Sequence, residues 1–211
     1  MAAITPWRQL LLESIQANKH LKHSEYFQLA TVRENGKPAN RTVVFSSRCF
    51  IKPAQSWRFT FQYFTVTGVP DPNKANVKQF TIEEIKAQAF GEICWYFTDT
   101  REQFRISGTL DVIGEADRNA VRLKMRERAW FQSSPNSRLQ FVGPSPGFPC
   151  PEGGPNDSTT PQLDPAQGPV ENFCLVTLEP QEVDYLNLRK NKRYVFQKMG
   201  EFSWTQREVN P

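Results

Sequence analysis

Residues 91–113 read GEICWYFTDTREQFRISGTLDVI, which predicts two antiparallel strands joined by a tight turn. Residues 93–98 are mostly apolar, aromatic or β-branched, a composition typical of a buried strand. From Gln103 onward the chain alternates, and one face carries Phe104, Ile106, Gly108, Leu110 and Val112. An apolar face this regular must be buried, either against a second sheet or inside a closed barrel.

The other face of the second strand is polar. It carries Gln103, Arg105, Ser107, Thr109 and Asp111. The amide of Gln103 and the guanidinium of Arg105 lie next to the turn, where the end of a strand can form the rim of a ligand site. The alternative that the pattern also allows is a surface hairpin whose polar face is in water.

The composition favours one domain over residues 1–211. With 38% hydrophobic and 12% aromatic residues in 211 positions, the chain is long enough for one sizeable core. The net charge of +4 suits the binding of a phosphate group. It is too small and too scattered to indicate nucleic acid, so we expect no nucleic-acid partner.

Cysteine and hydropathy patterns narrow the class of protein further. The cysteines are Cys49, Cys94, Cys150 and Cys174, and none of them forms a CxxC pair. His20 and His23 do not complete a zinc site with them, so we predict free thiols, no metal and a reducing compartment. Because no window of about 18 residues is continuously apolar and the N-terminus lacks a signal layout, we expect a cytoplasmic protein without membrane contact.

Further elements are predicted on either side of the hairpin. Thr5 and Pro6 are typical of a helix start, and residues 26–32 and 40–45 predict a second hairpin. We expect a helix capped by Asp117 and running to about residue 130, with Val121, Met125 and Ala129 inward and Arg126 outward.

The C-terminal part begins with a proline-rich stretch. Residues 143–170 hold eight prolines without periodicity and predict an irregular loop. Strands follow over residues 173–178 and 183–188, and we expect Glu179 and Pro180 to separate them.

Six motifs occur in an order that resembles a known family. They are PW at residues 6–7, LATV at 29–32, NRTVVF at 40–45, WYFTDTREQFRISG at 95–108, RAWFQSSPNSRLQF at 128–141 and VDYLNL at 183–188. Together they resemble the flavin-binding split barrels related to pyridoxamine 5′-phosphate oxidase, in the short branch without an assigned substrate.

This resemblance implies a mainly β fold, a six-stranded antiparallel split β-barrel with flanking helices. It also implies a homodimer with two FMN sites at the subunit interface. In the family, the positions of Arg41, Thr42, Val43 and Val44 serve the FMN phosphate and the edge of the ring. The position of Gln103 hydrogen-bonds the pyrimidine side of the flavin.

Residues 46–80 depart from the family pattern. The family has a TD-x-RS-x-K phosphate-binding segment there, and its Arg and Lys fall on Phe80 and Thr81, or on Lys78 if the register slips. Lys74 and Lys78 are therefore the candidate replacement cations. Within the block, residues 57–66 predict a strand and residues 68–73 a loop.

Several family positions near the C-terminus carry other residues in this chain. The family's Arg-x-His, which handles the vitamin substrate, reads Arg193-Tyr194-Val195 here. The family's flavin-contacting Trp and second Arg fall on Leu186 and Gln197.

Two functional hypotheses follow. The first hypothesis is an FMN-dependent oxidoreductase of unknown small-molecule substrate, with no catalytic residue assigned. The second is a non-catalytic split-barrel binding or scaffold protein in which FMN binding is weakened or lost.

Overall fold

The computed structural model describes most of the chain. The described residues are 6–45, 50–51, 58–64, 81–142, 163–164, 166–200 and 203–211. The predictions for Lys74, Lys78 and Phe80, for the loop over residues 68–73 and for most of the proline-rich loop lie outside these ranges.

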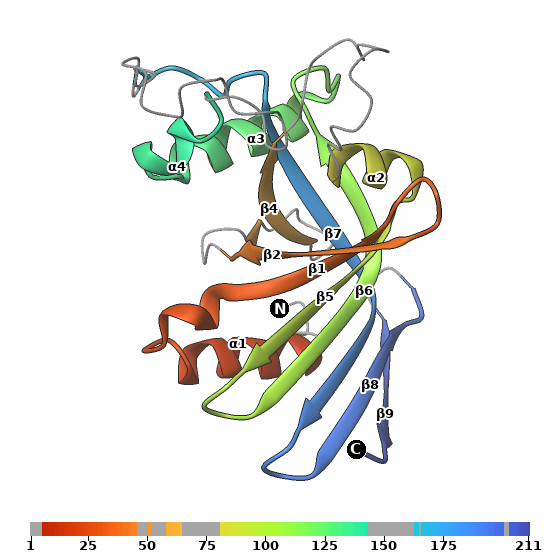
Figure 1. Cartoon of the computed structure of the whole chain (residues 1–211). Helices are drawn as coiled ribbons and strands as arrows, with labels where there is room; N and C mark the ends of the chain where they lie inside the picture. The colour runs from red at the N-terminus through yellow and green to blue at the C-terminus, as the bar shows by residue number, and fades with distance from the viewer. Residues whose placement is uncertain are drawn as a thin grey trace.

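The described strands form one antiparallel sheet, shown in Figure 1. They are β1 (Tyr26–Val32), β2 (Pro38–Val44), β3 (Phe50–Ile51), β4 (Arg58–Phe64), β5 (Phe90–Phe97), β6 (Glu102–Ile113), β7 (Phe173–Asn187), β8 (Lys192–Lys198) and β9 (Trp204–Val209). The order is β2-β1-β5-β6-β7-β4-β3, and β8 pairs with β7 and β9. The predicted mainly β split barrel is confirmed. It has nine described strands instead of six, because β3 is an added two-residue edge and β8 and β9 extend the sheet.

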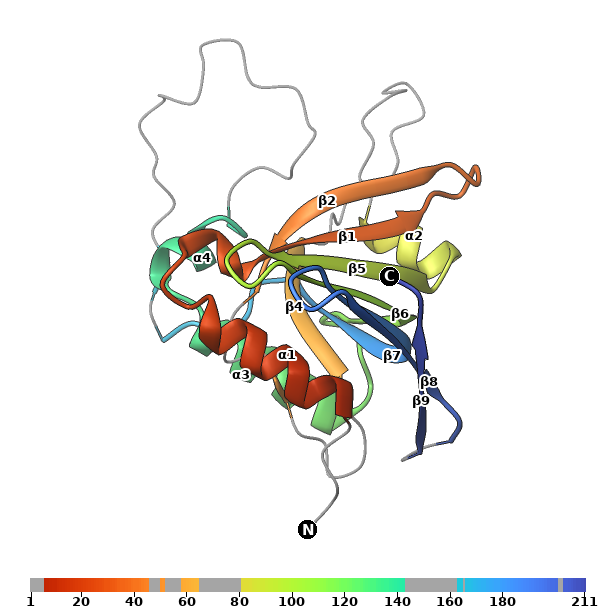
Figure 2. The same ribbon diagram turned by 90° about the horizontal axis from the view of Figure 1, so that it is seen from below.

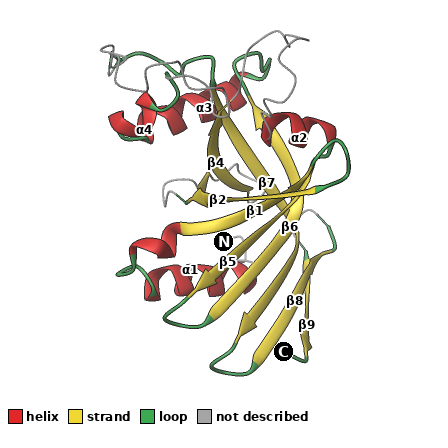
Figure 3. Ribbon diagram, viewed as in Figure 1, coloured by secondary structure: helices red, strands yellow, loops and turns green. Residues whose placement is uncertain are grey.

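Within the described residues, five helical segments flank the sheet. They are α1 (Pro6–Ala17), the 3₁₀ turn η1 (Lys22–Glu25), α2 (Thr81–Ala87), α3 (Ala120–Gln132) and α4 (Pro135–Leu139). In Figure 1, α3 lies above the sheet and α1 lies lower, beside the hairpin of β5 and β6, and in Figure 2, seen from below, α1 lies in front of α3. Figure 3 shows α2 beside the turn between β1 and β2. Among the described helices, none has the length and apolar content needed to span a bilayer.

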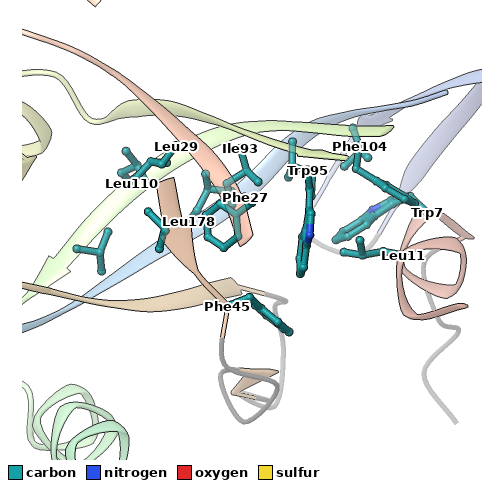
Figure 4. Packing of buried hydrophobic residues seen from close by; sticks show 14 of the residues in the cluster. Trp7, Leu11, Phe27, Leu29, Phe45, Ile93, Trp95, Phe104, Leu110 and Leu178 are labelled. Carbon is teal, nitrogen blue, oxygen red and sulfur yellow. The ribbon is translucent and has the colours of Figure 1, made fainter. Parts of the chain in front are cut away.

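The core is centred on the hairpin of β5 and β6. Ile93 pairs with Ile106 and Trp95 with Phe104, and all four side chains are fully buried. In Figure 4, Trp7 and Leu11 point from α1 into the same cluster as these barrel side chains. The predicted inward face of β6 is therefore confirmed, since its alternating apolar residues fill the barrel.

The strand β7 is continuous, so the prediction of two strands separated by Glu179 and Pro180 was wrong. It pairs with β6 along its length, with β4 through its first half and with β8 through its second half. Pro180 lies at a register shift, where Ser107 pairs with Glu182 and Gly108 with Pro180. A β-bulge leaves a residue outside the ladder, and a proline without an N–H group is tolerated there.

The helix α3 is rotated relative to its predicted orientation. Val121 is 68% exposed and Arg126 only 4%, so the predicted faces of these two residues were wrong. Nε of Arg126 donates to the carbonyl of Phe173 at 2.8 Å, and Nη2 donates to that of Val170 at 2.6 Å. A buried guanidinium needs acceptors, and these two carbonyls, at the start of β7 and just before it, supply them. Asn119, not Asp117, caps the helix.

Glu102 connects α1 to the sheet. Its Oε2 accepts a hydrogen bond from Ser14 at 2.8 Å, and its Oε1 accepts from Tyr185 at 2.5 Å and from Asn187 at 3.1 Å. Burial by itself raises the pKa of the Glu102 carboxyl. The hydrogen bonds that it accepts, led by those from Thr100 and Tyr185, have the larger effect, so the pKa lies below its ordinary value. The ionised form therefore stabilises the fold.

The bulge generates a first prediction. A Cβ atom on Gly108 would lie 2.1 Å from the carbonyl oxygen of Glu179, which is a backbone atom that cannot rotate away. We expect Gly108→Ala to lower the free energy of unfolding in urea by about 1 to 3 kcal/mol. Gly168→Ala is the control, because a Cβ atom there has no neighbour within 4 Å. Equal stability of the two variants would contradict the close approach.

Glu102 generates a prediction about pH. The pKa of Glu102 is lower in the folded than in the unfolded state. Its contribution to the free energy of unfolding is therefore complete above the unfolded-state pKa of about 4.3, and it is lost as the pH falls through the folded-state pKa. We expect Glu102→Gln to reduce the free energy of unfolding at pH 7, and the deficit relative to wild type to shrink near pH 3. Glu13→Gln, at an exposed position of α1, is the control. A deficit that does not change with pH would exclude this linkage.

Candidate functional site

The predicted site residues of β2 are divided between the two faces of the sheet. Val43 is 8% exposed and belongs to the core, whereas Val44 is 61% exposed. Neighbouring residues in a strand point to opposite faces, so Arg41 lies on the inner face with Val43, and Thr42 on the outer face with Val44. The structure does not bring the side chains of Arg41 and Thr42 together.

Arg41 is held by residues of β1 and α2. Its Nη1 donates to the carbonyl of Leu29 at 3.1 Å and to Oγ1 of Thr31 at 2.6 Å, and its Nη2 donates to Oε2 of Glu84 at 2.7 Å. The hydroxyl of Thr31 also donates to Oε2 of Glu84, at 2.5 Å. Because the Arg41 side chain is 19% exposed and that of Glu84 only 5%, this contact lies at the boundary between the core and the surface.

A second guanidinium lies near the same carboxylate. Nε of Arg33 is 3.6 Å from Oε1 of Glu84, beyond hydrogen-bonding distance but close enough for an ion pair. A buried carboxylate is stable when cations and donors surround it. Two guanidiniums beside one carboxylate give this cluster of three side chains a net positive charge, which suits an anionic ligand.

The predicted flavin contact Gln103 lies on the outer face of the sheet. It pairs with Tyr96 on β5 and with Leu186 on β7. Register pairs connect Thr42 to Gln28, Gln28 to Cys94 and Cys94 to Arg105, so the outward side chains of β2 and β6 share this face. The structure thus places Thr42, Val44 and Gln103 on one face, with Arg41 and Val43 on the other.

Beside Gln103, the outer face carries an ion cluster that the sequence did not predict. Arg105 donates to Oδ2 of Asp184, and Arg193 donates to the same carboxylate at 3.0 Å from Nε and 2.7 Å from Nη2. Burial raises the pKa of the Asp184 carboxyl, but the hydrogen bonds of the two guanidiniums lower it to below its ordinary value. The alternation of β7 could have indicated that Asp184 faces outward, but not its partners.

A cavity of about 790 Å³ opens on the same outer face. Its lining includes Ala30, Phe90, Glu92, Ser107, Glu182 and Gln197. Gln197 is the position that the resemblance matches to the family's second arginine, but none of the predicted cofactor residues Arg41, Thr42, Val43, Val44 and Gln103 is part of this lining.

The described cysteines have no site of their own. Neither Cys94 nor Cys174 forms a disulfide among the described residues, and Cys49 and Cys150 lie outside these residues. Burial and then the charge of Glu92 raise the pKa of the Cys94 thiol, which favours its protonated form. Within the described ranges, no group of three His, Cys, Asp or Glu side chains is placed to hold a metal ion.

Comparison with known proteins agrees with this architecture. Residues 4–114 match the family model described as pyridoxamine 5′-phosphate oxidase, FMN-binding domain. The chain is 44% identical over 212 residues to pyridoxine/pyridoxamine 5′-phosphate oxidase 2 of Arabidopsis thaliana, covering 99% of this chain and 98% of that protein.

Solved structures extend the comparison to three dimensions. A pyridoxamine 5′-phosphate oxidase-related, FMN-binding protein of Nostoc punctiforme has a TM-score of 0.83 and 34% identity, covering 99% of this chain and 100% of that one. PhzG of Burkholderia lata, with a TM-score of 0.62 and 15% identity over 99% of this chain and 98% of that one, shares the fold. The chain belongs to the pyridoxamine 5′-phosphate oxidase family of FMN-binding domains.

Proposed function

We propose that the protein is an FMN-dependent oxidoreductase that works as a homodimer on a small-molecule substrate. The observation that carries this proposal is the state of Arg41. A guanidinium has five N–H donors, and the contacts of Arg41 with other described residues use three of them. Its Nε–H and one Nη2–H remain, and they form the fork that binds two oxygens of a phosphate.

The outer face supports a site for the flavin ring. The side-chain amide of Gln103 makes no hydrogen bond to another described residue, so it has donors and an acceptor for a heterocycle. Bound FMN would supply hydride chemistry, and the protein would hold the cofactor and set its potential through hydrogen bonds. Arg41 thus offers donors for the phosphate and Gln103 offers polar groups for the ring, from opposite faces of the described sheet.

The usual substrate contacts of the family are altered in this chain. Tyr194, the middle residue of the Arg193-Tyr194-Val195 segment, stacks on Tyr185 with ring centroids 6.2 Å apart and planes 3° apart. Val195 stands where the family has its histidine, and Asp184 holds Arg193. The proposed substrate is therefore a small molecule without the family's usual contacts.

The second candidate function is a split-barrel binding or scaffold protein with weakened or lost FMN binding. The observation that favours it is the absence of the family's two cations at Phe80 and Thr81. The two candidates differ in one measurable property, which is whether the purified protein binds FMN.

The first prediction of this proposal concerns Arg41. We expect the wild-type protein to show flavin absorbance bands after purification or after incubation with FMN and gel filtration. Arg41→Ala should weaken FMN binding roughly ten- to hundredfold, because it removes a charge-assisted phosphate contact.

Two further variants are the controls for Arg41→Ala. Lys37→Ala removes a positive charge from an exposed turn of the same hairpin and should have little effect. Lys78→Ala should weaken binding less than Arg41→Ala. Wild-type protein that binds no flavin would favour the scaffold function.

The homodimer is supported by apolar side chains exposed on the outer face. Val44 is 61% exposed, Phe90 60%, Tyr26 45% and Tyr96 38%. A two-fold interface presents the same patch on both subunits, so such a face can pair with its own copy. An exposed apolar patch also incurs a cost in water that an interface removes.

The dimer generates its own prediction. Phe90→Glu should shift the protein toward the monomer in analytical ultracentrifugation at micromolar concentration, because it places a charge in the proposed interface. Phe131→Glu is a matched control, since Phe131 is 45% exposed but lies on α3. A monomeric wild-type protein, or equal effects of both variants, would refute this interface.

A further inference from the structure

Arg41, Thr31 and Glu84 form a closed ring of hydrogen bonds. Arg41 donates to Thr31 at 2.6 Å and to Glu84 at 2.7 Å, and Thr31 donates to the same Glu84 oxygen at 2.5 Å. The three residues come from β2, β1 and α2, so the ring joins separate parts of the fold. A ring of this kind restricts each side chain to one rotamer.

The ring occupies only one edge of the guanidinium. The bonds to Thr31 and Glu84 leave from Nη1 and Nη2, which form the end edge. The side edge, made of Nε–H and the second hydrogen of Nη2, has no acceptor among the described residues. Thr31 is 3% and Glu84 4% exposed, so the ring lies on the buried side of Arg41.

We propose that Thr31 and Glu84 are positioning residues that hold the side edge of Arg41 ready for two oxygens of a phosphate. This inference rests on the proposed binding of FMN and deepens it. Neither residue contacts the ligand in this arrangement. Both act through Arg41, whose long side chain would otherwise lose rotamer freedom when the ligand binds.

The geometry distinguishes positioning from competition. A carboxylate that competed with the phosphate would take the side edge, but Glu84 takes the end edge. Its negative charge is also compensated by Arg33, at 3.6 Å from its other oxygen. A phosphate can therefore bind without displacing Glu84, and it meets a cluster that is still positive.

The helix α2 makes Glu84 a rigid support. Ile82 and Ile85, on either side of Glu84, are 6% and 3% exposed and belong to the main core. Figure 1 shows α2 against the hairpin of β1 and β2, which carries Thr31 and Arg41. The seating of α2 on the barrel thus sets the orientation of Arg41.

The experiment compares FMN with riboflavin, which has the same ring but no phosphate. Dissociation constants are measured by quenching of flavin fluorescence for the wild type, Thr31→Val, Glu84→Ala and Glu84→Gln. Thr31→Val preserves shape and charge, and we expect it to weaken FMN binding about three- to tenfold. Glu84→Ala should do the same, and Glu84→Gln should retain part of the affinity because its amide oxygen can still accept from Arg41. Riboflavin binding should change less than twofold.

A double-mutant cycle completes the test. In an Arg41→Ala background, Thr31→Val should produce no further loss of FMN affinity, because the positioned group is already absent. FMN binding by Glu84→Ala that equals or exceeds wild type would overturn the proposal and identify Glu84 as a repelling charge. Equal losses for FMN and riboflavin would also overturn it. If the wild-type protein binds riboflavin and FMN equally, the proposed phosphate contact is wrong. If it binds neither flavin, the proposed FMN-dependent function is wrong as well.

Discussion

The antiparallel pairing of β6 with β7 is the interaction on which the other parts of the structure depend. One edge of β7 is hydrogen-bonded to β6 along most of the strand. The other edge pairs with β4 in the first half of β7 and with β8 in the second half. The bulge at Gly108 and Pro180 separates these halves, because one residue of β7 leaves the ladder there. One long strand can thus belong to the barrel and also carry the C-terminal strands beyond it.

This pairing also separates the side chains of the core from those of the outer face. Phe104 and Ile106 point inward and are fully buried, whereas Gln103 and Arg105 point outward beside Asp184. Residues on the inner face contribute to burial, and those on the outer face are available for a ligand or a second subunit. Arg41 is the exception, since it starts from the inner face of β2 and reaches the edge of the barrel with part of its side chain exposed.

Two carboxylates show how the fold supports charged groups near the proposed site. Both carboxylates are nearly buried. Glu84 accepts hydrogen bonds from Arg41 and Thr31, and Asp184 accepts them from Arg105 and Arg193. A buried carboxylate without such partners would cost several kcal/mol. With them, each carboxylate fixes the direction of one or two guanidiniums.

The sequence by itself determined the central hairpin, the inward face of β6 and the family, because alternation and motif order are properties of neighbouring residues. It did not determine that β7 is continuous through Pro180, since that depends on a bulge against Gly108. Nor did it place Val121 on the exposed face of α3 and Arg126 on the buried face, because the carbonyls to which Arg126 donates belong to residues 170 and 173. The contact of Arg41 with Glu84 joins residues 43 positions apart. Only the folded chain brings such groups within hydrogen-bonding distance, so the partners of each charged residue were decided by tertiary structure.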